Sequence, residues 1–84
     1  MKFTRQAADD LEFWKRSNPA LLKRIKQLFG DIESHPFTGI GKPEALKHDL
    51  AGWWSRRITH EHRVVYRIKD GDIEVVSLRF HYQR

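Results

Sequence analysis

The apolar residues of this 84-residue chain change their spacing once, near the middle. Before Pro36 they recur every three or four residues, which is the period of an α-helix that buries one face. From Trp53 onward they stand in short runs rich in β-branched and aromatic residues, as in strands. Helices followed by strands predict an α+β fold, in which a helix hairpin packs on one face of a small, twisted, mainly antiparallel β-sheet. At this length we expect residues 1–84 to form a single domain.

The first helix is predicted over about residues 5–16. Thr4 is a favoured type of N-cap residue, and a short strand is expected just before it, around Phe3. Three apolar residues at spacings of four and three give this helix a single face that can be buried. They are Ala7, Leu11 and Trp14.

The second helix begins at Asn18-Pro19, because Asn is a good N-cap and Pro is tolerated at the first helical position. It must end before Pro36, since the residue that precedes a proline avoids the α region. The short connection between the two helices predicts a helix hairpin. Residues 36–50 are expected to form an irregular loop with one helical turn around residues 43–47.

Three strands are predicted for the rest of the chain, over residues 53–58, 63–69 and 73–82. Asp70-Gly71 marks a hairpin turn between the last two. A two-residue turn would mix apolar and charged residues on each face, whereas a three-residue loop, Asp70 to Asp72 with a bulge, separates them. We therefore predict the three-residue loop. It would place Arg63, Arg79 and His81 on one face, and on the other, against the helices, Val64, Tyr66, Ile68, Val76, Leu78 and Phe80.

The composition favours a polyanionic partner, because 16 Lys and Arg residues outnumber 11 Asp and Glu residues and give a net charge of +5. The chain has no cysteine, so disulfides and cysteine-bound zinc are excluded. We see no signal peptide and no apolar run of membrane-spanning length. The expected location is the cytoplasm, away from a membrane.

An acid, a histidine and arginines in a small basic domain are the groups needed to cut RNA without a metal. Glu44 is the candidate general base that takes the proton of the attacking 2′-hydroxyl. His81 is the candidate general acid, because the reference pKa of histidine, about 6.5, suits proton donation. Arg63 could bind the phosphate through two hydrogen bonds, and Tyr82 could stack on a base. On residue type alone, Glu44 is more often a solvated loop acid or a salt-bridge partner, and a histidine such as His81 is usually an exposed surface residue.

Four further cations, Lys42, Arg56, Arg57 and Arg79, are candidate contacts to the RNA. Because Arg56 and Arg57 are neighbours in a predicted strand, they must point to opposite faces, and only one can reach the substrate. The sequence His60-Glu61-His62 lies in a predicted turn without a third ligand at a useful spacing, so we expect no metal site there.

The chain resembles a known family at this point. The segments PFTGIGKPEALKHDLAGWWSRRITHEHRVVYRI and RFHY, in this order, are similar to the YoeB (Txe) branch of the RelE-type bacterial toxins. The likeness covers almost the whole chain, and it implies a RelE-like fold. It also implies the toxin of a type II toxin–antitoxin pair, which enters the ribosomal A site and cleaves mRNA there without a cofactor.

The resemblance also implies roles for individual residues. Glu44 matches the family's general base, His81 its general acid, Arg63 its phosphate-binding arginine and Lys47 a supporting lysine, while Tyr82 matches the tyrosine that ends the usual chain. This chain continues beyond that tyrosine with two residues, Gln83 and Arg84. The implied partners are a cognate antitoxin, the ribosome with its mRNA, and operator DNA bound only through the antitoxin complex. Whether the free toxin is a monomer or a homodimer stays open.

Two other functions compete with the nuclease. One is a toxin of the same fold that inhibits a protein target, such as DNA gyrase, by binding alone. The other is an RNA-binding protein that uses the cationic sheet face without catalysis. Substitution of Glu44 separates the three, because a pure binder keeps its activity without this carboxylate.

Overall fold

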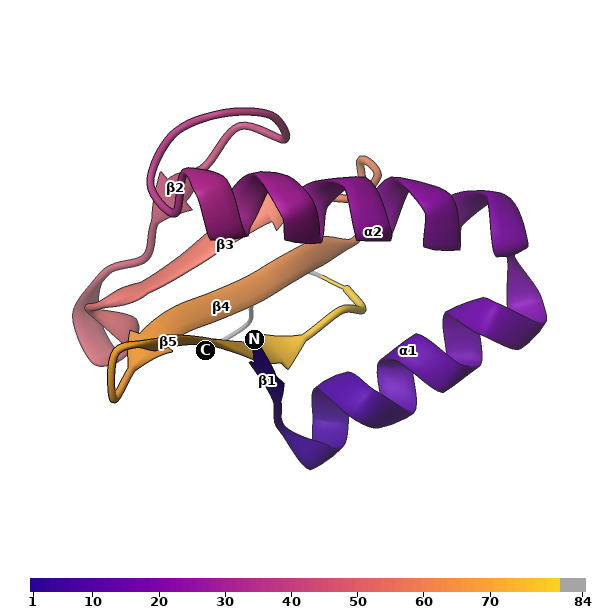
Figure 1. Cartoon of the computed structure of the whole chain (residues 1–84), viewed down its shortest axis with the longest axis horizontal. Helices are drawn as coiled ribbons and strands as arrows, with labels where there is room; N and C mark the ends of the chain where they lie inside the picture. Colours follow the sequence, from indigo (N-terminus) through magenta and orange to yellow (C-terminus); the bar gives the residue numbers. More distant parts are fainter. Residues whose placement is uncertain (81–84) are drawn as a thin grey trace.

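The computed structural model describes residues 1–80 and shows two helices followed by a sheet. Figure 1 shows α1 leading away from β1 and α2 then running back across β3 and β4. Neither helix of the described part is long and apolar enough to cross a membrane. In chain order, the elements are β1 (Lys2–Phe3), α1 (Arg5–Ser17), α2 (Pro19–Ser34), β2 (Glu44–Ala45), the 3-10 helix η1 (His48–Leu50), β3 (Trp53–Arg57), β4 (Arg63–Lys69) and β5 (Asp72–Ser77).

Both predicted helix starts are confirmed. The Thr4 side chain accepts a hydrogen bond from the backbone N–H of Ala7 over 3.1 Å, and Asn18 caps α2 in the same way with a bond of 3.2 Å from Leu21. Each bond satisfies one of the N–H groups that a helix start leaves without a partner. The loop before β3 differs from the prediction, because its helical turn is η1, after residue 47, while residues 44 and 45 form β2 instead.

The five strands form one sheet in the order β1-β5-β4-β3-β2. Neighbours are antiparallel except for β1, which lies parallel to β5. The two-residue strands β1 and β2 therefore occupy the two edges. The predicted α+β architecture, with a helix hairpin and a mainly antiparallel sheet, is confirmed.

The core fills the space between the helices and one face of the sheet. The sheet side is supplied by β4, β5 and the residues that follow β3 and β5. Large apolar side chains from all these elements lose their contact with water, which is the main stabilising contribution to a domain of this size. The buried members are Ala7, Trp14, Ile25, Leu28, Ile32, Ile58, Val64, Tyr66, Ile73, Val75 and Leu78.

The turn between β4 and β5 is shorter than predicted. Asp70 and Gly71 alone form it, and both have positive φ, 54° and 77°. The pairing then places Tyr66 opposite Val75. The predicted three-residue loop is therefore wrong: Asp-Gly adopts the two-residue turn with two positive φ angles, whose twist matches that of the flanking strands.

A β-bulge near the end of β5 restores the predicted register farther from the turn. Val65 lies opposite Ser77, so Val76 is an extra residue without a partner in β4. The bulge reverses the alternation, and for this reason both Val75 before it and Leu78 after it point into the core.

Half of the predicted sheet core is correct. Val64, Tyr66 and Leu78 are buried as expected, and Ile73 and Val75 take the place expected for Val76. The remaining two predicted core residues are half exposed, Ile68 by 47% and Phe80 by 51%. The last strand also stops at Ser77, before its predicted end.

Candidate functional site

The face of the sheet turned away from the helices, called the outer face below, carries several of the predicted site residues. Residues that lie opposite each other in neighbouring strands point to the same side of a sheet. Glu44 lies opposite Ser55, Ser55 opposite Val65, and Val65 opposite Ser77. Since the neighbouring row from Trp54 to Val75 faces the helices, Glu44 stands on the outer face.

Glu44 occupies the edge strand β2, where its side chain is exposed. Glu44 is flanked in sequence by two lysines that were predicted to belong to the site, Lys42 and Lys47, and both are exposed. Lys42 has a positive φ of 53°, directly after Gly41, whose carbonyl accepts a 2.7 Å bond from the backbone N–H of Arg57. This bond fixes the loop to β3 just ahead of Glu44.

Arg57 and Arg63 lie directly opposite each other at one end of β3 and β4. Arg57 is exposed and Arg63 partly exposed, and neither guanidinium has an ion pair among the residues that the structure describes. Both point to the outer face, since each is two residues along its strand from the Ser55–Val65 pair. Two like charges facing each other destabilise a sheet by themselves, so a negatively charged ligand would be well placed between or above them.

Glu44 and Arg63 share the outer face at a spacing that suits a bound phosphodiester. They are separated by two strand spacings of about 4.8 Å and two residue rises of about 3.4 Å, which puts their Cα atoms about 12 Å apart. A glutamate and an arginine can both reach toward a group midway across such a gap. The geometry fits a base on one side of an RNA phosphate and a cation on the other.

Arg56 points to the helix side and is fully buried, so the expectation that it contacts the substrate is not met. Its guanidinium forms an ion pair with Asp31 of α2 and donates to backbone carbonyls of the loop that leads to β2. The prediction that Arg56 and Arg57 point to opposite faces of the sheet is confirmed, with Arg57 exposed on the outer face. The accepting carbonyls are those of His35, Thr38 and Ile40.

The contacts of Arg56 make it the anchor of the loop before Glu44. Its Nε donates to the Tyr66 hydroxyl over 3.1 Å, and that hydroxyl donates to the carbonyl of Pro36 over 2.6 Å. The bond from Arg56 lowers the pKa of Asp31, and the backbone N–H of Ile40 contributes in the same direction. Burial raises the pKa of Tyr66.

A glycine is required where this loop crosses the Arg56–Asp31 pair. Gly39 has a φ of 120°, and a Cβ atom there would overlap the Asp31 carboxylate. The loop can approach the ion pair so closely only because this residue lacks a side chain.

Arg79 lies against α1 instead of sharing the outer face with Arg63. Its guanidinium carbon is 3.7 Å from the ring centroid of Phe13 and 5.1 Å from that of Phe80. The expected face is wrong for this residue because β5 ends at Ser77, so strand alternation no longer sets its direction. A guanidinium over aromatic faces is stabilised there by cation–π attraction.

Two predicted catalytic residues, His81 and Tyr82, lie outside the described residues. Their roles remain predictions. Within residues 1–80, no three His, Asp or Glu side chains come together in a way that could hold a metal ion.

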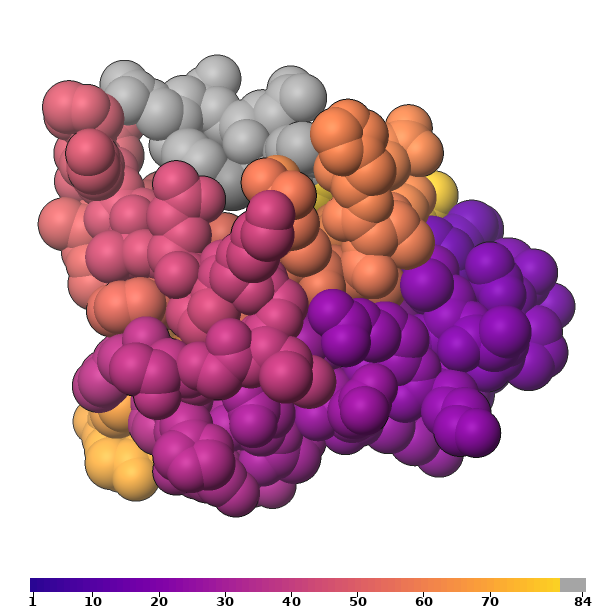
Figure 2. Space-filling model, turned by 90° about the horizontal axis from the view of Figure 1, so that it is seen from above, coloured from indigo at the N-terminus to yellow at the C-terminus, as the bar shows by residue number. Residues whose placement is uncertain are grey.

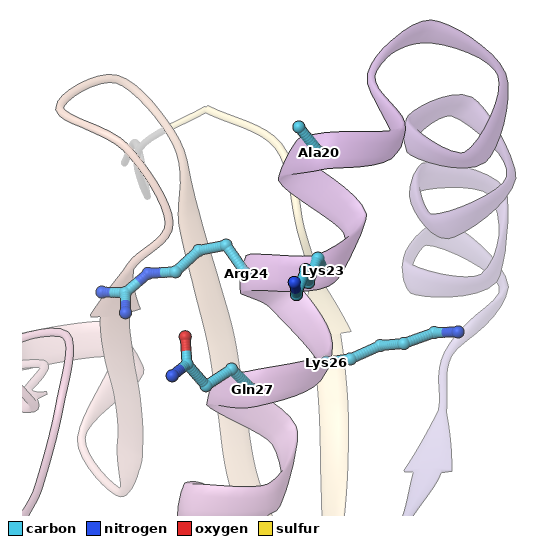
Figure 3. A pocket seen from close by; sticks show the side chains of 5 residues that line it. All are labelled: Ala20, Lys23, Arg24, Lys26 and Gln27. Carbon is cyan, nitrogen blue, oxygen red and sulfur yellow. The ribbon is translucent and has the colours of Figure 1, made fainter.

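A second cationic surface, on α2, was not singled out from the sequence. Lys23, Arg24 and Lys26 line a hollow with Ala20 and Gln27, and Figure 3 shows Arg24 and Lys26 extending to opposite sides of the helix. These residues belong to the helix layer, which covers the face of the sheet opposite to the outer face, and Arg24 reaches from there to the Arg57 carbonyl over 3.4 Å. Their spacing along one helix is the signal that would have revealed them.

Figure 2 shows the surface formed by the loop and its neighbours. Residues 35–50, from magenta to pink, form one continuous mass beside α2, and the orange β3–β4 connection projects separately. The anchored loop is thus a substantial part of this surface, as expected for a segment held by Arg56.

The chain matches the sequence profile of the family described as the YoeB-like toxin of bacterial type II toxin-antitoxin systems, over residues 3–82. Among curated proteins, "Toxin YoeB" of Synechocystis is 51% identical over 82 residues, which cover 98% of this chain and 95% of that protein.

Solved structures agree with this similarity. The YoeB/ParE toxin from Agrobacterium tumefaciens superposes with a TM-score of 0.91 at 49% identity, covering 98% of this chain and all of the other. A YoeB dimer and a YoeB–YefM complex from Staphylococcus aureus each give a TM-score of 0.88, at 40% and 41% identity, covering 96% of this chain and 94% of theirs.

Proposed function

This chain belongs to the YoeB family of toxins from bacterial type II toxin–antitoxin systems, and from that premise we propose that it is a ribosome-dependent mRNA endoribonuclease. It would enter the ribosomal A site, cut the codon there and so stop translation. The cut needs no metal, and it leaves a cyclic phosphate on the upstream fragment.

The observation that carries this proposal is the placement of Glu44 on the same outer face as the opposed pair Arg57 and Arg63. A carboxylate can accept a proton, and two arginines can hold the negative charge that builds up on a phosphate during attack. A surface that only bound RNA would gain nothing from a carboxylate near the phosphate, since like charges repel.

In the proposed reaction, Glu44 takes the proton of the 2′-hydroxyl, and the 2′-oxygen forms a bond to the adjacent phosphorus. The bond from phosphorus to the 5′-oxygen breaks, and His81 gives its proton to that oxygen. Arg63 and Arg57 stabilise the charged phosphate, with Lys42 and Lys47 as supporting cations. The aromatic ring of Tyr82 stacks on a base of the codon.

Partners follow from the same premise. YefM accompanies the Staphylococcus aureus relative in its complex, and we propose that a cognate antitoxin of this kind neutralises the present toxin. Operator DNA would be bound only by that complex. The relative's dimer suggests that a homodimer is an accessible state of the free toxin. Because its substrate is translating mRNA, the toxin acts in the cytoplasm.

Primer extension on an mRNA held by purified ribosomes tests the proposal. Wild-type protein should produce one cut within the A-site codon, and Glu44→Gln should reduce the rate by about 10²–10⁴-fold, the usual contribution of a general base. His81→Gln should lose activity on a similar scale. Glu12→Gln is the matched control, because Glu12 is an exposed glutamate on α1 and its removal should leave the rate unchanged.

Intact mRNA with wild-type protein, under conditions where the protein still arrests cell growth, would contradict the nuclease. The toxin would then act by binding a protein target, and inhibition of DNA gyrase supercoiling would be measured next. Full cleavage by Glu44→Gln would instead leave the nuclease in place and remove Glu44 as its base.

A further inference from the structure

The chain that leaves β5 is held by four hydrogen bonds within three residues. The N–H of Leu78 donates to Asp10 Oδ2 over 2.9 Å, and its carbonyl accepts from Trp14 Nε1 over 2.9 Å. The N–H of Phe80 donates to His62 Nδ1 over 2.7 Å, and its carbonyl accepts from the N–H of Arg63 over 3.1 Å. The backbone N–H and the carbonyl of both Leu78 and Phe80 therefore have partners outside any regular strand.

Phe80 adopts a backbone conformation that its side chain disfavours. Its φ is 60°, in the left-handed region, where an ordinary residue is strained by about 1–3 kcal/mol. Phe80 as a whole residue is 51% exposed, so its burial offsets little of this strain. The two hydrogen bonds to its backbone are the interactions that hold the turn, and the residue after this turn is His81.

His62 is suited to hold the turn because its ring is itself fixed. Its side chain is 15% exposed, and the ring packs edge-on against Trp14 with the centroids 4.9 Å apart. The ring of Phe80 lies on it with a centroid distance of 5.1 Å. Since Nδ1 accepts the Phe80 N–H, it carries no proton, and the proton of the neutral ring lies on Nε2, 3.8 Å from the Glu61 carboxylate.

We propose that His62 is a positioning residue, which accepts the Phe80 N–H and thereby fixes the backbone turn at Phe80, the residue that precedes His81 in the sequence. Its link to cleavage rests on the proposed function. His62 acts through the backbone of Phe80. The next residue, Arg63, has two roles, because its backbone N–H donates to the Phe80 carbonyl and its side chain belongs to the cationic pair with Arg57. The turn and the arginine pair are thus fixed by adjacent residues.

Two substitutions separate the acceptor of His62 from its ring. His62→Phe keeps a ring between Trp14 and Phe80 but has no acceptor. His62→Asn loses the ring contacts, yet its Oδ1 can stand where Nδ1 stands and accept the same N–H. We expect His62→Phe to lower the cleavage rate at saturating ribosomes by about 10²-fold, as a small misplacement of a catalytic group does. His62→Asn should retain most of the rate in spite of a lower melting temperature.

Amide hydrogen exchange, followed by NMR on the free protein, tests the hydrogen bond from the Phe80 N–H to His62 without any RNA. The Phe80 amide should be protected in the wild type and in His62→Asn, and it should exchange at least about tenfold faster in His62→Phe. The amide of Tyr66, in the middle of β4, should be unchanged in His62→Phe. Equal exchange of Phe80 in wild type and His62→Phe would overturn the proposal, whatever the protein does to mRNA.

Growth arrest on expression provides an activity readout that does not assume a nuclease. Growth arrest that is strongest for wild type, weaker for His62→Asn and weakest for His62→Phe supports the positioning role. This holds even if primer extension shows no cut and the proposed function fails. If activity instead follows melting temperature, so that His62→Asn is the weaker toxin, then His62 contributes only by packing and the proposal is wrong.

Discussion

Arg67 of β4 lies opposite Glu74 of β5, and its Nε donates to Glu74 Oε1 over 2.7 Å. The Arg67 guanidinium also lies 5.5 Å from the ring centroid of Trp53, on the next strand. This pair exists only in the register set by the two-residue turn. The charged residues that seemed to mix the faces are therefore paired with each other, and the β-bulge at Val76 then returns the apolar residues to the core.

The register predicts different costs for two neighbouring valines. Val75→Ala should lower the free energy of unfolding by about 2 kcal/mol, because it removes two buried methyl groups and leaves a cavity. Val76→Ala, at the partly exposed bulge position, should cost less than half as much. Urea unfolding of both variants measures the difference. A larger loss for Val76→Ala than for Val75→Ala would contradict this register and favour the three-residue loop.

Loss of the Arg56 side chain should destabilise the protein strongly. Arg56→Met leaves the Asp31 carboxylate and several loop carbonyls without their donor, and we expect a loss of about 3 kcal/mol in urea unfolding. Arg57→Met is the matched control in the next position. Its side chain is exposed, so its effect on stability should stay within about 0.5 kcal/mol. Similar losses in the two variants would remove Arg56 as the anchor of the loop.

The Asp31 ion pair should make stability depend on acidity. The pKa of Asp31 is lowered from its ordinary 3.8 in the folded protein, so on acidification the unfolded chain takes up the proton first. The stabilisation is complete above pH 3.8, and it is lost as the pH falls through the lowered value. The gap in urea midpoint between wild type and Asp31→Asn should therefore narrow below pH 3.8. A gap that stays constant from pH 7 to pH 2 would contradict this, and Asp9→Asn on exposed α1 should show no gap of similar size.

The opposed arginines Arg57 and Arg63 should lower the stability of the protein slightly and raise its cleavage rate. Arg63→Gln removes repulsion from Arg57 and should leave stability unchanged or raise it by a few tenths of a kcal/mol, while the cleavage rate on ribosomes falls by about 10²–10³-fold. Arg67→Gln should do the opposite, because it breaks the pair with Glu74 and leaves the proposed site intact. Thermal unfolding and primer extension on the same preparations measure both quantities. An Arg63→Gln protein that cuts at the wild-type rate would exclude Arg63 from the site.

The helices could be predicted closely from the sequence because their signals are local. Thr4 and Asn18 cap the helices within one turn of the chain, and Pro36 limits the second helix. The β4–β5 register could not, because two local preferences disagreed. Asp70-Gly71 favoured a short turn and the apolar pattern favoured a long one, and a bulge several residues away satisfied both. The residue types near Val76 do not predict that bulge.

The candidate site could be predicted in part, since alternation along a strand fixes relative directions but not which side the helices cover. The sequence required Arg56 and Arg57 to diverge, and only the fold shows that Arg56 turns inward to Asp31. Arg79 could not be placed because the strand ends before it. The contact between His62 and Phe80 joins residues 18 positions apart, where periodicity has no information.

The two edges of the sheet also affect whether copies of this molecule associate through their strands. The edge strands β1 and β2 have two residues each, and their neighbours complete the cover: the Thr4 hydroxyl donates to the Val76 carbonyl over 2.7 Å, and Leu46 donates to Trp53 over 2.9 Å. An extended segment of another chain finds little free backbone to pair with along these borders of the described sheet. The shortness of the outermost strands thereby guards a small, concentrated protein against joining edge to edge into fibrils.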